Sequence, residues 1–415
     1  MRLALLLLLS ASLIACPGVD DDDATVNDDD AADDDDAADD DDAADDDDAA
    51  NDDDSGDDDD ASPPPLAFPP TSIWYQDVSS APTHADSDAV VAWMAQDGNS
   101  FEPNNEFRMT LGFNIFSTDD PATLRDFTPT DDFFVGSCDP GRVPVPPGGS
   151  LEDEVDYACS SDGDCHLLVH YRPANLLYEM WRGDIPGGSH DGAEFFGGCM
   201  AVWDLERDYG WNTASGLDHD AMGRGVDCTS ADAAGYPISP LVFTPEELAA
   251  GEIAHALRFV LPNRNIREDI YVAPATHSTP ATSGPATAPP YGAHFRLKPQ
   301  AALEATHSDV DFGALSPGAQ VIVTALQTYG MFLSDGGNIA LTGASDLHSD
   351  IKYCDHDRFT WCDDDPDRLL HEHDLKFLRI TDFEMLDHGG PERTWTGDCT
   401  LLYSYDDQAL TVTEN

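Results

Sequence analysis

The chain has 415 residues, with 82 acidic side chains against 19 Lys and Arg, and a formal net charge of −63. So large an excess of negative charge argues against nucleic acid or an anionic membrane surface as a direct partner. The length suffices for one large domain or two closely packed lobes, and no internal repeat or second linker divides it.

The first fifteen residues have the pattern of a secretory signal. Arg2 is their only charged side chain, and the apolar run 3–9 is shorter than the roughly 20 residues that cross a bilayer. Leu13-Ile14-Ala15-Cys16 resembles the lipobox of bacterial lipoproteins, which implies cleavage before Cys16 and lipidation of that residue. An ordinary signal peptide with an incidental cysteine is the alternative. We therefore expect an exported monomer, lipid-anchored to a bacterial membrane, at the outer membrane or the cell surface.

Residues 16–62 form a segment of unusual composition. It holds 26 Asp between Asp20 and Asp60, mostly in blocks separated by Ala-Ala, and no large apolar residue after Val26. Such a segment has nothing to bury and its charges repel, so we expect a disordered, extended tether. Weak calcium buffering is the alternative to a simple spacer.

The remaining residues, 63–415, are expected to fold into one extracytoplasmic domain with a net charge near −38, because 56 acidic and 18 basic side chains are left. Eight cysteines in an exported chain predict up to four disulfides, and the absence of Cys-x-x-Cys pairs disfavours zinc. Two pairs are close enough to close short loops, Cys159 with Cys165 and Cys354 with Cys362. The full set is Cys138, Cys159, Cys165, Cys199, Cys228, Cys354, Cys362 and Cys399.

Three helices are predicted from caps and periodicity: 86–96, one from Thr244 to about His255, and one from Ser316 to Gly330. Most other segments are short and alternate. The run 331–341 is typical of a β-hairpin, and we predict further strands at 257–261, 270–272, 293–297 and 375–380. This pattern predicts a β-rich α+β fold, a single sandwich- or barrel-like domain with about three peripheral helices.

A predicted hairpin at 166–181 contains the most informative polar side chains. If Tyr171 pairs with Leu176, alternation places Leu167, Val169, Tyr171, Leu176, Tyr178 and Met180 on a core face. The opposite face then carries His166, His170, Glu179 and Trp181. These residues suggest acid–base catalysis by Glu179 with a histidine, beside a stacking indole. The alternative is a second half-buried face whose polar groups are structural.

Other candidates are individually weaker. His255 and Arg258 lie where a helix passes into a strand, and His277 lies in a loop. Arg296 is a further residue that could hold a substrate carboxylate or hydroxyl groups. His371 and His373 could face a metal, although an exposed charged stretch is the simpler interpretation. Residues 162–164 and 363–367 are acidic loops without the full calcium pattern, so we predict no cofactor apart from calcium as an open alternative.

The chain looks like a group of uncharacterised secreted bacterial proteins. The segments that carry this likeness are Ser72-Ile73-Trp74, Leu177-Tyr178-Glu179-Met180-Trp181, residues 251–259, Pro274-Ala275-Thr276-His277 and residues 326–331. The resemblance spans most of the folded part and implies one shared fold. It implies no activity, and the disulfides are inferred from this chain alone.

No Gly-x-Ser-x-Gly elbow, phosphate-binding loop or dinucleotide fingerprint is present, which excludes several common enzyme classes. Export and a polar face favour a polysaccharide hydrolase or lyase, and the negative charge favours a neutral glycan. In that hypothesis Glu179, His166 and His170 catalyse, and Trp181, Arg258, His255, His277 and Arg296 bind the substrate. A non-catalytic module that binds a glycan or a protein is the alternative.

Overall fold

The computed structural model describes residues 66–101, 104–160, 163–211, 219–354, 367–387, 389–406 and 409–412. The chain divides into two units, Met1–Ala61 and Ser62–Asn415. The predicted signal peptide, Cys16 and the acidic tether lie outside the described residues. The second unit is a strand-rich α+β structure, which confirms the predicted fold class.

Four α-helices are present among the described residues, and each of the three predicted helices is one of them. Local signals explain their starts: Thr244 and Ser316 both cap a helix that begins with Pro, and Thr244 forms a capping box with Glu247. Their bounds are α1 Ser87–Met94, α2 Pro245–Ala250, α3 Gln300–Thr306 and α4 Pro317–Thr328.

A six-stranded mixed sheet forms the centre of the larger hydrophobic core, in the order β1-β15-β11-β14-β13-β16. Its middle strand β11 is buried at every position. Because both faces of β11 are covered, it runs through the interior of the sheet with β14 and β15 on its two sides. The strands are β1 Met109–Phe113, β11 Leu257–Leu261, β13 His294–Leu297, β14 Met331–Gly336, β15 Leu341–Ala344 and β16 Phe383–Met385.

A second sheet of four strands has the order β2-β6-β7-β9. Its strands are β2 Ile115–Thr118, β6 His166–Tyr171, β7 Leu176–Trp181 and β9 Met200–Asp204. β6 and β7 pair with Tyr171 opposite Leu176, the predicted register. One face of this hairpin packs in its own hydrophobic cluster, as expected. The other face is buried too, because Leu168 and Leu177 pack against residues around the six-stranded sheet.

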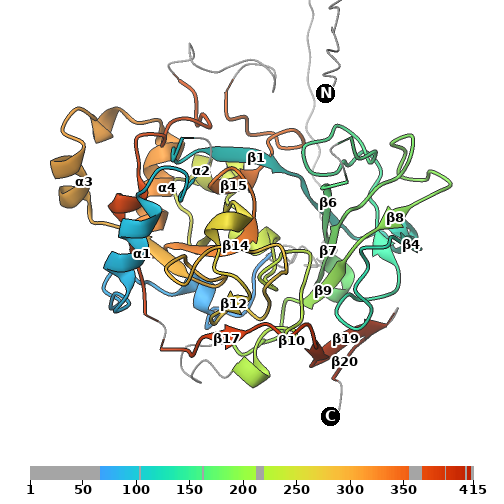
Figure 1. The fold of residues 1–415 in the computed structure, drawn as a ribbon. Helices are drawn as coiled ribbons and strands as arrows, with labels where there is room; N and C mark the ends of the chain where they lie inside the picture. Colours follow the sequence, from blue (N-terminus) through green and yellow to red (C-terminus); the bar gives the residue numbers. More distant parts are fainter. Residues whose placement is uncertain are drawn as a thin grey trace, which may run out of the picture. The chain divides into compact units, whose positions relative to one another are not determined.

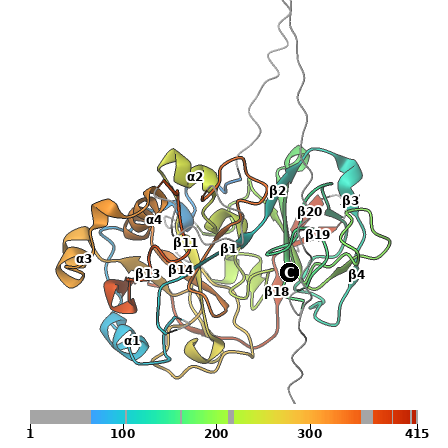
Figure 2. The ribbon, with the colours of Figure 1, turned by 90° about the horizontal axis from the view of Figure 1, so that it is seen from above.

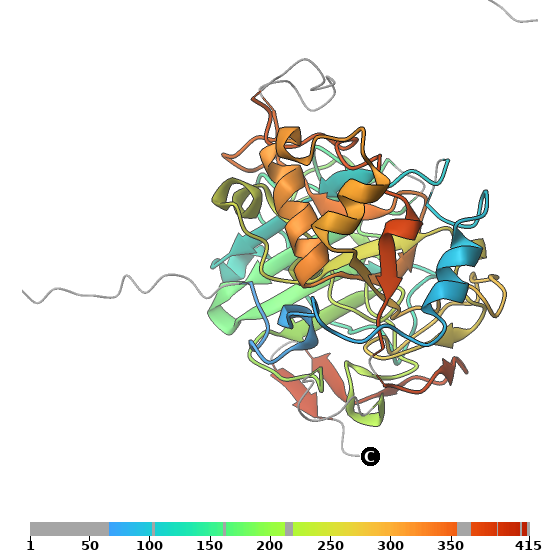
Figure 3. The same ribbon diagram turned by 90° about the vertical axis from the view of Figure 1, so that its left-hand side faces the viewer.

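The chain passes directly from one sheet to the other. β1 ends at Phe113 and β2 begins at Ile115, and the buried amide of Asn114 between them donates to Ser150 and Leu151. Figures 1 and 2 show α1, α3 and α4 on one side of the folded unit and the four-stranded sheet on the other. In Figure 3 the orange α3 and α4 lie in front of the central strands. No sheet among the described residues closes into a barrel.

Ten further short strands pair in twos. They are β3 Leu124–Arg125 with β5 Val143–Pro144, β4 Thr128–Pro129 with β8 Phe196–Gly197, β10 Gly225–Val226 with β18 Thr400–Leu401, β12 Ile270–Tyr271 with β17 Arg393–Thr394, and β19 Tyr403–Asp406 with β20 Ala409–Val412.

Four details of the prediction were wrong. Strands β14 and β15 do not form a hairpin, because β11 lies between them. Helix α2 stops before Gly251, whose φ of 82° ends the helix well short of His255. Residues 375–377 form a turn and Ile380 begins the 3₁₀ helix Ile380–Asp382, with Leu375, Leu378 and Ile380 buried at a spacing that does not alternate as in a strand. Helix α3 was missed because it buries only Leu303 and so shows no periodicity.

Three disulfides join pairs of described cysteines: Cys138–Cys199, Cys159–Cys165 and Cys228–Cys399. Cys354 is also disulfide-bonded, and Cys362 lies outside the described residues. Disulfides of this kind form in oxidising compartments, in keeping with an exported domain. None of the helices that the structure describes is long and apolar enough to cross a membrane.

Candidate active site

A cavity of about 1000 Å³ lies between the part of the folded unit built on the four-stranded sheet and the part built on the six-stranded sheet. Its walls come from segments distant in sequence: the loop 133–137, residues 227–233, the loop 277–281 and residues 395–400. Trp181 at the end of β7 and Asp335 in β14 also line it. Two disulfides contribute a cysteine to the wall, Cys199 and Cys399, so covalent bonds hold two of these segments in place.

Asp335 reaches the cavity because strand β14 carries a bulge. Phe259 pairs with Leu333 and Val260 pairs with Asp335, so Ser334 is the extra residue on β14. Bulges of this kind commonly re-aim a side chain beside a functional site. The Asp335 side chain is 27% exposed, and it lines the cavity.

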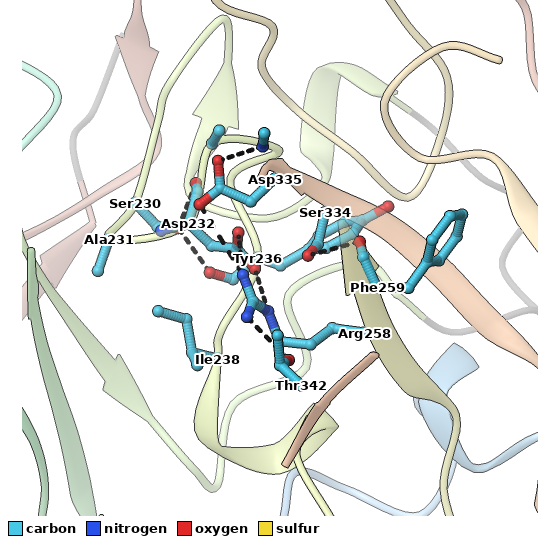
Figure 4. A network of polar contacts seen from close by, with 12 residues as sticks. Ser230, Ala231, Asp232, Tyr236, Ile238, Arg258, Phe259, Ser334, Asp335 and Thr342 are labelled. Atoms are coloured by element: carbon cyan, nitrogen blue, oxygen red, sulfur yellow. Dashed lines mark hydrogen bonds and ion pairs between the residues drawn. The ribbon is translucent and has the colours of Figure 1, made fainter. Parts of the chain in front are cut away.

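The buried side of Asp335 faces an ion pair formed by Arg258 and Asp232 (Figure 4). Arg258 donates from Nε and Nη2 to the two oxygens of Asp232, at 3.1 and 3.0 Å, and from Nη1 to Thr342 Oγ1 at 3.0 Å. Its Nη2 lies 3.8 Å from Asp335 Oδ2. One guanidinium therefore serves two carboxyl groups, with the closer, bidentate pairing going to Asp232.

This arrangement favours the protonated form of Asp335. Burial and the negative charge of Asp232 raise the pKa of Asp335 to about 8, although Arg258 and the Gly336 N–H oppose the change. The exposed part of the side chain opens into a cavity, so protein surrounds it on the remaining sides. Asp335 can therefore act as a proton donor near neutral pH.

His277 has the opposite protonation behaviour. Its Nδ1 lies 2.7 Å from the Ala233 carbonyl oxygen, which can only accept, so Nδ1 carries the hydrogen and Nε2 the lone pair. Burial lowers the pKa of His277 to about 4, outweighing that hydrogen bond and the charge of Asp227. The imidazole is neutral at pH 7 and can accept a proton.

Aromatic side chains surround these polar groups. The Trp395 ring packs edge-on against His277 at 5.4 Å, and Trp181 donates from Nε1 to Asp164 at 2.8 Å. Tyr291 is fully buried and lines the cavity. At the rim, Phe134 and Val135 are 55% and 91% exposed. Flat apolar faces beside hydrogen-bonding groups are typical of sites that bind sugar rings.

The predicted catalytic residues Glu179, His166 and His170 do not line this cavity. Glu179 is 0% exposed, and its carboxylate accepts hydrogen bonds from the Ile238 and Ser239 N–H groups, the Ser239 hydroxyl and Trp203 Nε1. Its acceptor sites are taken by protein donors, which makes it structural. The second face of the hairpin packs against residues around the six-stranded sheet, which agrees with the alternative of structural polar groups.

The two histidines of that hairpin are also internal. His166 contacts Glu152 at 2.5 Å through Nδ1 and the Ala231 carbonyl through Nε2. His170 contacts Asn175 Oδ1 at 3.0 Å. Neither lines the cavity. Trp181, from the same face, does line it, because it stands at the open end of β7.

The four remaining predicted residues divide in the same way. His277 lines the cavity, and Arg258 lies directly behind Asp335. His255 instead contacts Glu247 at 3.1 Å near the start of α2, and Arg296 pairs with Glu384 beside the Val78 and Ala81 carbonyls. His255 and Arg296 therefore do not belong to the site.

Asp232, Tyr291 and Trp395 were missed as site residues. The Ser334–Gly337 segment is typical of a turn, and a polar residue such as Asp335 is common in a turn without having a functional role. Asp232 and Trp395 lie in irregular segments where periodicity carries no information. Only the tertiary fold brings them together.

No metal centre is supported within the described residues. One group of three potential ligands is present, Glu154, Cys159 and Cys165, but its two cysteines are joined in a disulfide. The acidic loops considered for calcium, 162–164 and 363–367, lie partly outside the described residues. In the part of 162–164 that is described, Asp164 accepts from Trp181. His371 and His373 pack ring to ring at 5.1 Å in a turn region, away from the cavity.

Comparison of the chain with protein-family models, with curated proteins and with solved structures gave no match.

Proposed function

We propose that the folded domain is a glycan hydrolase, with the cavity as its active site, Asp335 as general acid and His277 as general base. One observation carries this proposal. A single cavity is lined by Asp335, whose carboxyl group keeps its proton near neutral pH, by His277, whose neutral imidazole can accept a proton at Nε2, and by several aromatic side chains. Groups with protonation states driven in opposite directions are the usual basis for dividing acid and base roles.

The reaction would follow the inverting scheme for glycosides. His277 Nε2 takes a proton from a water molecule as its oxygen bonds to the anomeric carbon. The glycosidic C–O bond breaks, and Asp335 gives its proton to the departing oxygen. A base with a pKa of about 4 resembles the carboxylates that serve this role in other glycosidases.

Arg258 and Asp232 act as positioning residues in this scheme. Arg258 lies 3.8 Å from Asp335 but is committed to Asp232 by two shorter hydrogen bonds. Because Arg258 is paired with Asp232, it stabilises the ionised form of Asp335 only in part. The negative charge of Asp232 also disfavours ionisation of Asp335. Both effects preserve the proton that the acid must donate.

Hydrolysis fits the cavity better than β-elimination. A lyase acting on uronic acids must hold a substrate carboxylate, which requires cations, whereas the charged residues of the lining are all acidic. The domain would be displayed as a lipid-anchored protein, a proposal supported by the lipobox-like Leu13-Ile14-Ala15-Cys16 and by the disulfides.

A non-catalytic glycan-binding module is the second candidate. The observation in its favour is that Asp335 belongs to a buried ion cluster, which would also suit a purely structural carboxyl group.

Asp335→Asn separates the two candidates when the full-length protein is tested for release of reducing ends from a panel of neutral and amino glycans. We expect a loss of cleavage of about 100-fold or more, typical of removing a general acid. An aryl glycoside with a good leaving group needs less acid assistance and should lose less. The matched control Asp309→Asn, in an exposed turn, should retain full activity.

Unchanged cleavage by Asp335→Asn would refute the assignment of the acid. Glycan binding without cleavage of any member of the panel by the unmodified protein would leave the binding module as the correct function.

A further inference from the structure

The charged side chains that line the cavity are all acidic. Asp164, Asp227, Asp335 and Asp398 line it, and no Lys or Arg does. Asp335 is the group whose proton is retained, which leaves three acidic side chains to set the charge near neutral pH. His277 does not compensate them, because its pKa of about 4 keeps it neutral. Asp164 and Asp398 therefore make the exposed part of the lining negative, although Arg258 lies 3.8 Å from Asp335 on its buried side and Arg182 lies over the Trp181 ring.

Aromatic rings lie among these carboxylates. Trp181 is joined to Asp164 by a hydrogen bond, and Trp395 precedes Asp398 by three residues in the same wall. Aromatic faces attract cations, and the attraction grows where water is excluded. Carboxylates and indoles together are the side chains that recognise a positively charged amine.

A third feature points to a ligand independently of charge. Tyr291 is completely buried and lines the cavity, and among the described residues its hydroxyl makes no hydrogen bond of normal geometry apart from a contact with Thr279. Burial raises the pKa of Tyr291 well above its ordinary value, with Asp335 and Asp232 adding to the effect and Thr279 opposing it weakly. The phenol is therefore neutral and keeps its hydrogen as a donor at the cavity wall.

We propose that this cavity selects a sugar unit that carries a protonated amine, such as a glucosamine residue of a partly or fully deacetylated glycan. The choice of a glycan rests on the proposed function, whereas the preference for a positive charge rests on the lining alone. Asp164 and Asp398 are the exposed members of the acidic set and determine this specificity.

Calorimetric binding to the full-length protein tests the preference directly. The probes are the glucosamine tetramer, its N-acetylated counterpart and a galacturonate tetramer, at pH 6 where the amines are protonated. We expect the glucosamine tetramer to bind about tenfold more tightly than the acetylated one, from several partly exposed charge pairs. The galacturonate tetramer should bind more weakly than either.

Single charge removals identify the cavity as the origin of the preference. Asp398→Asn and Asp164→Asn should each lower glucosamine affinity about threefold and leave the acetylated tetramer unaffected. Asn at position 164 keeps an oxygen that can accept from Trp181. Glu304→Gln, an equal charge loss on exposed α3 outside the cavity, should change nothing. The 26 aspartates of residues 20–60 are the same in every variant, so their own attraction for amines cancels.

Equal or tighter binding of the acetylated tetramer, or an unaltered ratio in both cavity variants, would overturn the inference. An amine preference without any cleavage would contradict the hydrolase but support the inference. Cleavage without an amine preference would support the hydrolase and contradict the inference.

Discussion

Replacing Glu179 by Gln distinguishes a catalytic from a structural role for the residue that the sequence favoured as an acid or base. Glu179 Oε1 accepts from Ile238 N, Ser239 N and Ser239 Oγ at 2.9, 2.7 and 2.8 Å. Oε2 accepts from Trp203 Nε1 at 3.1 Å and shares the Ile238 N–H at 2.9 Å. All these donors point at a carboxylate that no solvent reaches.

The amide can replace only one oxygen without loss. In its better orientation, the glutamine oxygen would take the position of Oε1 and the amide nitrogen that of Oε2. The indole N–H of Trp203 would then face another donor, and the amide itself would lack an acceptor. Two buried unsatisfied groups at about 1–3 kcal/mol each predict a destabilisation of about 4 kcal/mol.

Equilibrium unfolding in urea, followed by tryptophan fluorescence with the disulfides intact, measures this loss. Glu384→Gln is the matched control, because Glu384 is 31% exposed and pairs with Arg296 near the surface. The control should lose less than about 1 kcal/mol. A Glu179→Gln protein as stable as the control, but inactive on glycans, would refute the structural assignment and restore the catalytic one.

Two other changes test the surroundings of the site. Burial lowers the pKa of His166, but Glu152 outweighs this and raises it to about 9, so its stabilisation is complete below pH 6.5 and is lost as the pH rises through 9. The difference between the folded and unfolded pKa of His166 corresponds to about 3 kcal/mol at most, so the urea midpoint should decrease as the pH rises from 6.5 to 9. The His166→Gln variant should show a smaller decrease. An equally steep decrease in the variant would disprove this origin. Replacing both Cys228 and Cys399 by Ser should lower stability by about 2–5 kcal/mol and weaken glycan binding, since Cys399 belongs to the cavity wall. Unaltered affinity in that double variant would mean that the disulfide does not hold the wall. The hydrolase itself predicts a bell-shaped pH profile of kcat/KM, with limbs near 4 and 8 set by His277 and Asp335; a profile that stays flat across pH 8 would exclude Asp335 as the acid.

Local sequence signals were sufficient for the parts of the fold that depend on neighbouring residues. The capping box at Thr244 and the Ser316-Pro317 start both place a helix correctly, because a cap acts within one turn. The register of β6 with β7 follows from alternation across a short connection. The presence of disulfides follows from the cysteine count and a secretory signal.

The tertiary structure alone decided what each polar side chain faces. Alternation correctly put Glu179 and Trp181 on one face of the hairpin, yet packing buries the first and leaves the second at the cavity. Likewise, Asp335 becomes a candidate acid only because β11 separates β14 from β15 and brings Arg258 and Asp232 beside it. These contacts join residues about 26 to 100 positions apart, and no periodicity along the chain reports such distances. The chemistry of a side chain is fixed by the sequence, whereas its protonation and accessibility depend on what the fold places around it.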